Sequence, residues 1–151
     1  KNISSAPKQI SVYIFLSETC PICQSYTLTL KQLYQEYSKK DIQFTGVFPN
    51  YYSTEKTINE FKTKYNIPFK LIKDIGHKLT LHFNASITPE VFVEDSEKKL
   101  LYCGRIDDTF FTVGKRRSVC TNTELADALK QISLGLQIKI NKTNKIYKII
   151  I

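Results

Sequence analysis

Apolar and polar residues follow two different periods along the first half of the chain. Residues 10–16 form a dense β-branched and aromatic run, which is typical of a buried central strand. Apolar residues then recur at close to helical spacing from Pro21 to Tyr37. Pro suits the first helical position because its missing N–H needs no partner there. Residues 41–48 alternate as a second strand does and end at Pro49. This half therefore predicts a βαβ unit.

The second half predicts a helix, a hairpin and a final helix. A helix capped by Ser53 or Thr54 is followed by a helical turn or two within residues 76–83. Residues 90–94 and 99–103 have the composition of strands and are separated by a short polar turn. They therefore predict a β-hairpin, and the helix that follows it closes the domain.

The last helix and the tail behind it have different patterns. The helix has apolar residues on one face and is expected to stop at Gly135. Residues 136–140 and 145–151 are Ile-rich runs around a plausible turn, and their apolar surface is costly in water. We predict one domain over residues 1–135 and a C-terminal β extension over residues 136–151. The extension is expected to pack on the sheet edge of its own domain or to form a homodimer.

Length and charge narrow the class of protein. A chain of 151 residues is long enough to bury one core. No apolar run approaches the roughly 20 residues that span a bilayer, so no stable membrane insertion is expected. The formal net charge is +8, but the lysines are dispersed along the chain rather than gathered in one basic block. Dispersed lysines are typical of a solvated surface, and we expect no nucleic-acid binding.

The candidate chemistry is concentrated in the sequence Cys20-Pro21-Ile22-Cys23, between the first strand and the first helix. A thiolate at a helix N-terminus faces unpaired N–H groups and the positive end of the helix dipole, which lower its pKa. Cys23 lies one turn further on the same side and can convert a mixed disulfide into an intramolecular one. A redox pair is therefore favoured over half a zinc site or an inert bridge. No metal or cofactor is expected.

The order of these features resembles the thioredoxin-like superfamily over about residues 11–132. The resemblance rests on a strand, Cys-x-x-Cys at a helix start, a second strand, and Thr88-Pro89 before a hairpin. It implies an α/β fold with a central mixed β-sheet flanked by helices. It also implies that Pro89 is a cis-proline beside the cysteines, and that Pro21, Thr88 and Pro89 contact an extended substrate. Four segments look like the redoxin branch, which includes alkyl hydroperoxide reductases and extracytoplasmic thiol–disulfide proteins: residues 47–49, 87–93, 102–108 and 114–117.

The main enzymatic alternative is a peroxiredoxin-like thiol peroxidase. That family has a Pro-x-x-x-Thr/Ser-x-x-Cys motif, in which Ser17 matches the hydroxyl position and Cys20 the cysteine. Tyr13 stands in the place of the leading proline. A further alternative is a non-catalytic binding module whose cysteines form only a structural bridge.

Several polar residues and cysteines outside the pair have open roles. Glu18 is a weak candidate for proton transfer to the second cysteine of the pair. Cys103 and Cys120 can form a second disulfide, which we favour slightly, or remain two separate thiols.

Two clusters of charge lie between the hairpin and the last helix. Arg105 is followed by Asp107 and Asp108, and residues 115–117 are basic. Arg105 can either stabilise a thiolate or form a surface salt bridge with one of these aspartates, and for the two clusters we favour a salt-bridged surface loop over a partner or ligand contact.

These observations together predict a thiol–disulfide oxidoreductase acting on thiols and disulfides of partner proteins. Cys20 is the attacking thiol and Cys23 the resolving thiol. We expect the protein to work outside a bacterial cytoplasm, in the periplasm or envelope.

Overall fold

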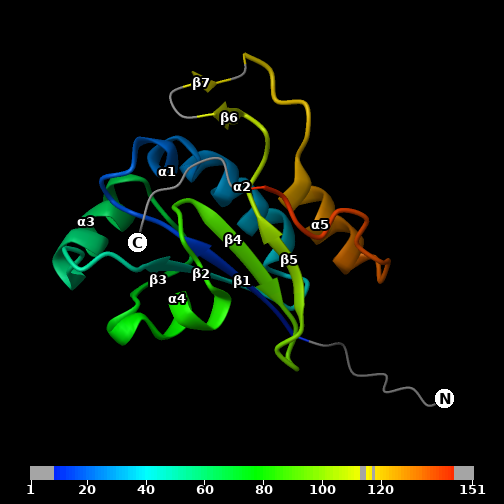
Figure 1. Ribbon diagram of the computed structural model, residues 1–151, viewed down its shortest axis with the longest axis horizontal. Helices are drawn as coiled ribbons and strands as arrows, with labels where there is room; N and C mark the ends of the chain where they lie inside the picture. Colours follow the sequence, from blue (N-terminus) through cyan, green and yellow to red (C-terminus); the bar gives the residue numbers. More distant parts are fainter. Residues whose placement is uncertain (1–8, 113–114, 117, 145–151) are drawn as a thin grey trace.

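A five-stranded mixed sheet forms the centre of the molecule (Figure 1). The computed structural model describes residues 9–112, 115–116 and 118–144. The strands of the sheet are β1 (Ile10–Phe15), β2 (Ile42–Phe48), β3 (Lys70–Lys73), β4 (Glu90–Glu94) and β5 (Leu100–Gly104). Their order across the sheet is β3-β2-β1-β4-β5. Strands β1, β2 and β3 are parallel, whereas β4 is antiparallel to both β1 and β5. The predicted α/β thioredoxin-like architecture is confirmed.

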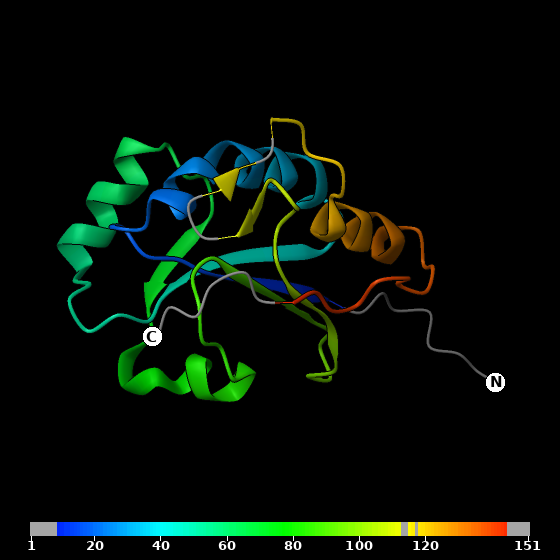
Figure 2. The ribbon, with the colours of Figure 1, turned by 45° about the horizontal axis from the view of Figure 1, so that its top comes forward.

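Helices cover both faces of this sheet (Figure 2). They are α1 (Pro21–Ser25), α2 (Thr27–Tyr37), α3 (Glu55–Lys64), the 3-10 helix η1 (Ile75–His77), α4 (Lys78–Phe83) and α5 (Glu124–Ser133). Helices α2, α3 and α5 lie over one face, and α4 lies against the other. Within the described residues, no helix combines the length and the hydrophobicity needed to cross a membrane.

Alternation along the central strand divides the core between the two faces. Successive side chains of a strand point to opposite sides of the sheet. Val12 and Ile14 accordingly pack with the residues of α2, α3 and α5, whereas Phe15 packs with Phe92 and with Phe83 of α4. Side chains are therefore packed on both faces of β1, which fixes the strand that leads to Cys20.

The helix starts agree with the sequence patterns. Helix α1 begins at Pro21, and the helical segment is divided at Tyr26, where α1 ends and α2 begins. Thr54 caps α3: its hydroxyl accepts the Thr57 N–H, and the Thr57 hydroxyl oxygen accepts the Thr54 N–H. This reciprocal arrangement satisfies two backbone donors that the first turn leaves open.

The loop between the hairpin and the last helix differs from the prediction. It contains a small sheet of β6 (Phe110–Thr112) and β7 (Lys115–Arg116), which stands above α1 and α2 in Figure 1. Arg105 does not pair with the aspartates that follow it. Its guanidinium binds the carboxylate of Glu124 on α5, with Nε 3.1 Å from Oε1. The aspartates are occupied by hydroxyl and N–H donors instead.

The tail differs from the prediction over residues 136–140, whereas the expected packing on the sheet edge of its own domain is found at residues 141–143. No strand forms over residues 136–140, because the chain turns back on the end of α5. The Leu136 N–H binds the Gln131 carbonyl at 2.8 Å, and the Lys139 N–H binds the Gln131 side chain at 3.0 Å. The following residues run along the edge of β5, with an isolated parallel bridge between Cys103 and Lys142. The second predicted run, residues 145–151, lies outside the described residues.

Candidate active site

Cys20 lies at the end of the loop between β1 and α1, immediately before the helix. It is the N-cap residue of α1, with an extended backbone (φ −88°, ψ 112°), and Pro21 occupies the first turn. The Cys23 N–H points at the Cys20 sulfur, with N and Sγ 3.4 Å apart. A sulfur in this position takes one of the backbone donors that have no partner within the helix.

The two sulfurs of the pair are placed in opposite environments. The hydrogen bond from the Cys23 side chain, with further donors from the backbone of Cys23 and Ile22, lowers the pKa of Cys20 to about 6 from its ordinary value of 9.0. Burial opposes this shift but does not cancel it. Cys23 has no exposed surface, and its burial raises the pKa of that thiol well above the ordinary value. At neutral pH these surroundings favour the thiolate form of Cys20 and the thiol form of Cys23.

The loop before β4 closes the other side of the site. The Cys20 thiol donates to the Thr88 carbonyl oxygen at 3.7 Å, and the Thr88–Pro89 peptide bond is cis. The carboxylate of Glu90 accepts the N–H groups of Ser86 and Ile87 at 3.0 and 3.4 Å. The structure thus brings the Thr88–Pro89 loop up to the cysteine pair, although these residues are 68 positions apart in the chain.

Tyr52 fixes the segment before Cys20 from across the site. Its hydroxyl lies 2.7 Å from the Ser17 hydroxyl and 3.0 Å from the Thr19 hydroxyl. The Cys20 N–H in turn binds the Ser17 carbonyl at 3.2 Å. Sequence reasoning missed Tyr52, because nothing local relates it to a loop more than thirty residues away.

Hydrogen bonds to Glu18 fix the same segment before Cys20. Its two carboxylate oxygens accept hydrogen bonds from the hydroxyls of Ser53 at 2.7 Å and Thr57 at 2.6 Å. These contacts join the segment before Cys20 to the start of α3. The residue considered for proton transfer to Cys23 therefore has a positioning role in this structure.

The expected second disulfide is absent. All four cysteines are unbridged, so the preference for a Cys103–Cys120 bond is wrong. Cys103 lies in β5, where its N–H and carbonyl pair with the tail. The Cys120 thiol instead donates to Asp108 Oδ1 at 3.3 Å, and burial together with that carboxylate raises its pKa.

A buried phenol–carboxylate contact adjoins the pair and was not foreseen either. Tyr26, between α1 and α2, donates its hydroxyl proton to Asp107 Oδ1 at 2.5 Å. Burial and the neighbouring carboxylate raise the pKa of Tyr26, so it remains a neutral donor. This contact ties the helix that carries the cysteines to the segment after β5.

Comparison with known proteins agrees with this geometry. The family model described as AhpC/TSA family matches residues 2–103, which is more than half of the chain. The chain belongs to the AhpC/TSA family. The resemblance to the redoxin branch of the thioredoxin-like superfamily is thereby confirmed. Peroxiredoxin Bcp of Bacillus subtilis (strain 168) is 31% identical over 77 residues, 51% of this chain and 47% of that protein. The aligned region thus spans about half of that relative.

Solved structures share the fold at low sequence identity. A hypothetical protein from Sinorhizobium meliloti 1021 superposes with a TM-score of 0.79 at 21% identity, over 93% of this chain and 78% of that one. A secreted Mycobacterium tuberculosis disulfide oxidoreductase, described as homologous to E. coli DsbE, has a TM-score of 0.55 at 16% identity. That match covers 85% of this chain and 82% of the other. At these identities the likeness establishes the fold.

Proposed function

We propose that the chain is a thiol–disulfide oxidoreductase that reduces or exchanges disulfides in partner proteins. The observation that carries this proposal is the position of Cys20 at the helix start, with a lowered pKa and the Cys23 N–H on its sulfur. A thiolate held by backbone donors is a ready nucleophile, and a second thiol one turn away is what a resolving step needs.

The reaction consists of two exchanges. The Cys20 thiolate attacks one sulfur of the partner's disulfide, which forms a mixed disulfide and releases the other partner sulfur as a thiolate that takes a proton. Cys23 then gives up its proton and attacks the Cys20 sulfur. The Cys20–Cys23 disulfide forms and the second partner thiolate leaves. Two electrons pass from the pair to the partner, and an external dithiol must reduce the pair again before the next turnover.

Pro21, Thr88 and Pro89 are the residues we assign to binding the partner. Thr88 already places its carbonyl oxygen against the Cys20 thiol. An extended partner segment that presents a disulfide to Cys20 must pass this loop. The predicted location outside a bacterial cytoplasm belongs to this proposal.

Reduction of insulin by dithiothreitol tests the proposal. The wild-type chain is expected to accelerate precipitation of the insulin B chain, and Cys20→Ser should remove the acceleration completely. Cys120→Ser is the matched control, because Cys120 lies outside the pair and should keep the wild-type rate. A wild-type chain that leaves the dithiothreitol rate unchanged would refute the proposal.

Peroxide reduction is the second candidate, favoured by the identity with peroxiredoxin Bcp. In this chain the Ser17 hydroxyl, which matches the hydroxyl of the peroxiredoxin motif, is engaged by Tyr52 and Thr19. Tyr13 stands in the place of the motif's leading proline. We therefore expect slow consumption of hydrogen peroxide. Fast turnover that disappears in Cys20→Ser would reverse the ranking of the two functions.

A further inference from the structure

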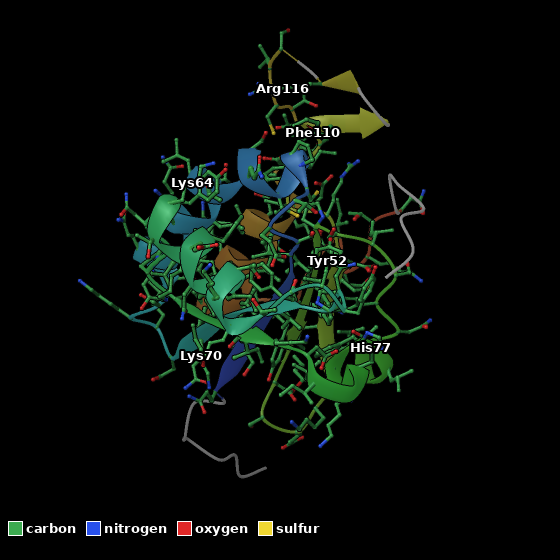
Figure 3. All side chains as sticks on the ribbon, turned by 90° about the vertical axis from the view of Figure 1, so that its left-hand side faces the viewer. Tyr52, Lys64, Lys70, His77, Phe110 and Arg116 are labelled. Atoms are coloured by element: carbon green, nitrogen blue, oxygen red, sulfur yellow. The ribbon has the colours of Figure 1, made fainter. Side chains whose placement is uncertain are left out.

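A pocket opens directly beside the cysteine pair. Its apolar lining consists of Ile22, Tyr26, Ile87, Pro89, Ile106 and Phe110. Ile22 lies between the two cysteines, and Pro89 follows the residue whose carbonyl meets the Cys20 thiol. Figure 3 shows Phe110 and Arg116 together at the small β6–β7 sheet, and the Arg116 guanidinium lies 5.9 Å from the Phe110 ring centre. The pocket therefore adjoins the Thr88–Pro89 loop and the helix turn that flank Cys20.

The tail reaches the same pocket by pairing with the edge of β5. The Cys103 N–H binds the Asn141 carbonyl at 3.0 Å, and the Thr143 N–H binds the Cys103 carbonyl at 3.1 Å. The Arg105 N–H then binds the Thr143 hydroxyl oxygen at 2.8 Å. The next residue, Asn144, lines the pocket.

Gly104 provides the space that this close pairing needs. It has a φ of +143°, a backbone conformation that residues with a Cβ rarely adopt. A Cβ at this position would overlap the hydroxyl and the backbone nitrogen of Thr143. The strand edge is therefore shaped to hold the tail against it, which fixes the position of Asn144 at the pocket.

We propose that the tail residues Thr143 and Asn144 form one wall of the partner-binding groove, and that the Asn144 amide binds the backbone of the partner segment. The occupant is an extended segment of a disulfide-bearing protein whose residue next to the cysteine is apolar. This inference rests on the proposed function and names its substrate class.

The chemistry of the lining selects that occupant. The charged groups at the pocket are already paired, Arg105 with Glu124, and Glu90 with the N–H groups of Ser86 and Ile87. A charged partner side chain would lose its hydration there without a counter-charge, whereas an apolar one gains from burial. The Asn144 amide carries both a donor and an acceptor, which matches the N–H and C=O of an extended backbone.

Two synthetic peptide disulfides test the proposal in the full chain, one with Leu and one with Asp after the cysteine. The wild type is expected to have the lower KM for the Leu peptide. Asn144→Ala should raise that KM roughly three- to tenfold, the effect of one lost hydrogen bond, and leave kcat unchanged. Asn144→Gln, which keeps the amide, should recover part of the loss. Lys142→Ala is the control, because this neighbouring exposed tail residue does not line the pocket.

A binding measurement separates this inference from the proposed function. The same Leu sequence with S-methylcysteine cannot react, so its Kd reports the groove alone. If the wild type binds this peptide and Asn144→Ala weakens it, the groove stands even where turnover is absent and the proposed function has failed. The proposal that the tail forms part of the groove would be overturned if Asn144→Ala left KM and Kd unchanged. It would also be overturned if Lys142→Ala raised them as much as Asn144→Ala does.

Discussion

Cys20 and Cys120 are both partly exposed thiols, but their surroundings act on them in opposite directions. Cys20 receives a hydrogen bond from the Cys23 side chain and N–H donors from the first turn of α1, and these lower its pKa to about 6. Cys120 is partly buried and its thiol donates a hydrogen bond to the Asp108 carboxylate, and both effects raise the pKa of this thiol. The comparison shows that hydrogen-bond donors favour the thiolate form of Cys20, whereas burial and a carboxylate favour the protonated form of Cys120.

The carboxylate beside Cys120 is itself fixed as an anion. Burial opposes ionisation of Asp108, but donors from Thr121 and Asn122 outweigh it and hold the pKa of that carboxyl below its ordinary value. Asp108 is therefore negative throughout the neutral range. Together with burial, this negative charge keeps the Cys120 thiol protonated at neutral pH.

The largest expected effect separates the roles within the pair. Cys23→Ser should accumulate a mixed disulfide with a partner protein, since the first attack occurs but the resolving thiol is missing. Cys20→Ser should trap nothing, and neither should Cys120→Ser. Non-reducing gel electrophoresis of the three variants measures this directly. Equal trapping by Cys20→Ser and Cys23→Ser would remove the assigned order of attack.

The pH dependence of alkylation tests the two environments themselves. A folded pKa of about 6 means that Cys20 is protonated below this value, so its alkylation rate should rise through about pH 6 and level off near pH 7 to 8. The Cys120 rate should still be rising at about pH 9, because its pKa is raised. Mass spectrometry of iodoacetamide-treated chain, digested after short exposures, gives both rates at once.

The size of the difference follows from two opposed terms. At about pH 6, half of Cys20 is thiolate against about a thousandth of a thiol with pKa 9, a roughly 500-fold advantage. A low-pKa thiolate is a weaker nucleophile, which reduces this rate advantage about 20-fold. The remaining advantage of Cys20 is roughly 20-fold. A Cys20 rate that follows the Cys120 profile would show that the helix start does not activate this thiol, and would favour the binding-module alternative.

The smallest expected effect concerns the Tyr52 hydroxyl, which binds the segment before Cys20. Tyr52→Phe removes the hydroxyl that joins Ser17 and Thr19 but keeps the ring. The loss of these contacts should slow Cys20 alkylation about two- to fivefold and raise the pH at which the rate levels off. Tyr51→Phe is the matched control, because this neighbouring ring is 88% exposed. Identical profiles for both variants would leave Tyr52 without a positioning role.

The sequence predicts local relationships well. The run of residues 10–16, the Pro at the start of α1 and the spacing of Cys20 and Cys23 each depend on neighbours within a few positions, and all three are found in the structure. The family resemblance extended this to the mixed sheet flanked by helices and to the approach of the Thr88 loop to the pair.

Long-range partners of polar side chains were not predictable. Arg105 has two aspartates within three positions, but it pairs with Glu124, which only the packing of α5 brings near. Tyr52 is part of the site through contacts across more than thirty residues. The tail has strand-like composition, but side-chain and backbone contacts with Gln131 turn residues 136–139 away from a strand. For Arg105 and Tyr52 the fold selected a partner far away in the sequence, whereas the tail is turned by a residue of the helix just before it.

The complete burial of Cys23 has a consequence for oxidative damage. Within the pair, small oxidants in solution reach Cys20 first, because the Cys23 sulfur has no exposed surface. A sulfenic acid formed on Cys20 has a thiol one helical turn away, with which it can condense to a disulfide and release water. This condensation competes with further oxidation to the irreversible sulfinic state. The buried Cys23 thiol thus protects Cys20 from irreversible oxidation. The product of oxidation is a Cys20–Cys23 disulfide, which a dithiol can reduce.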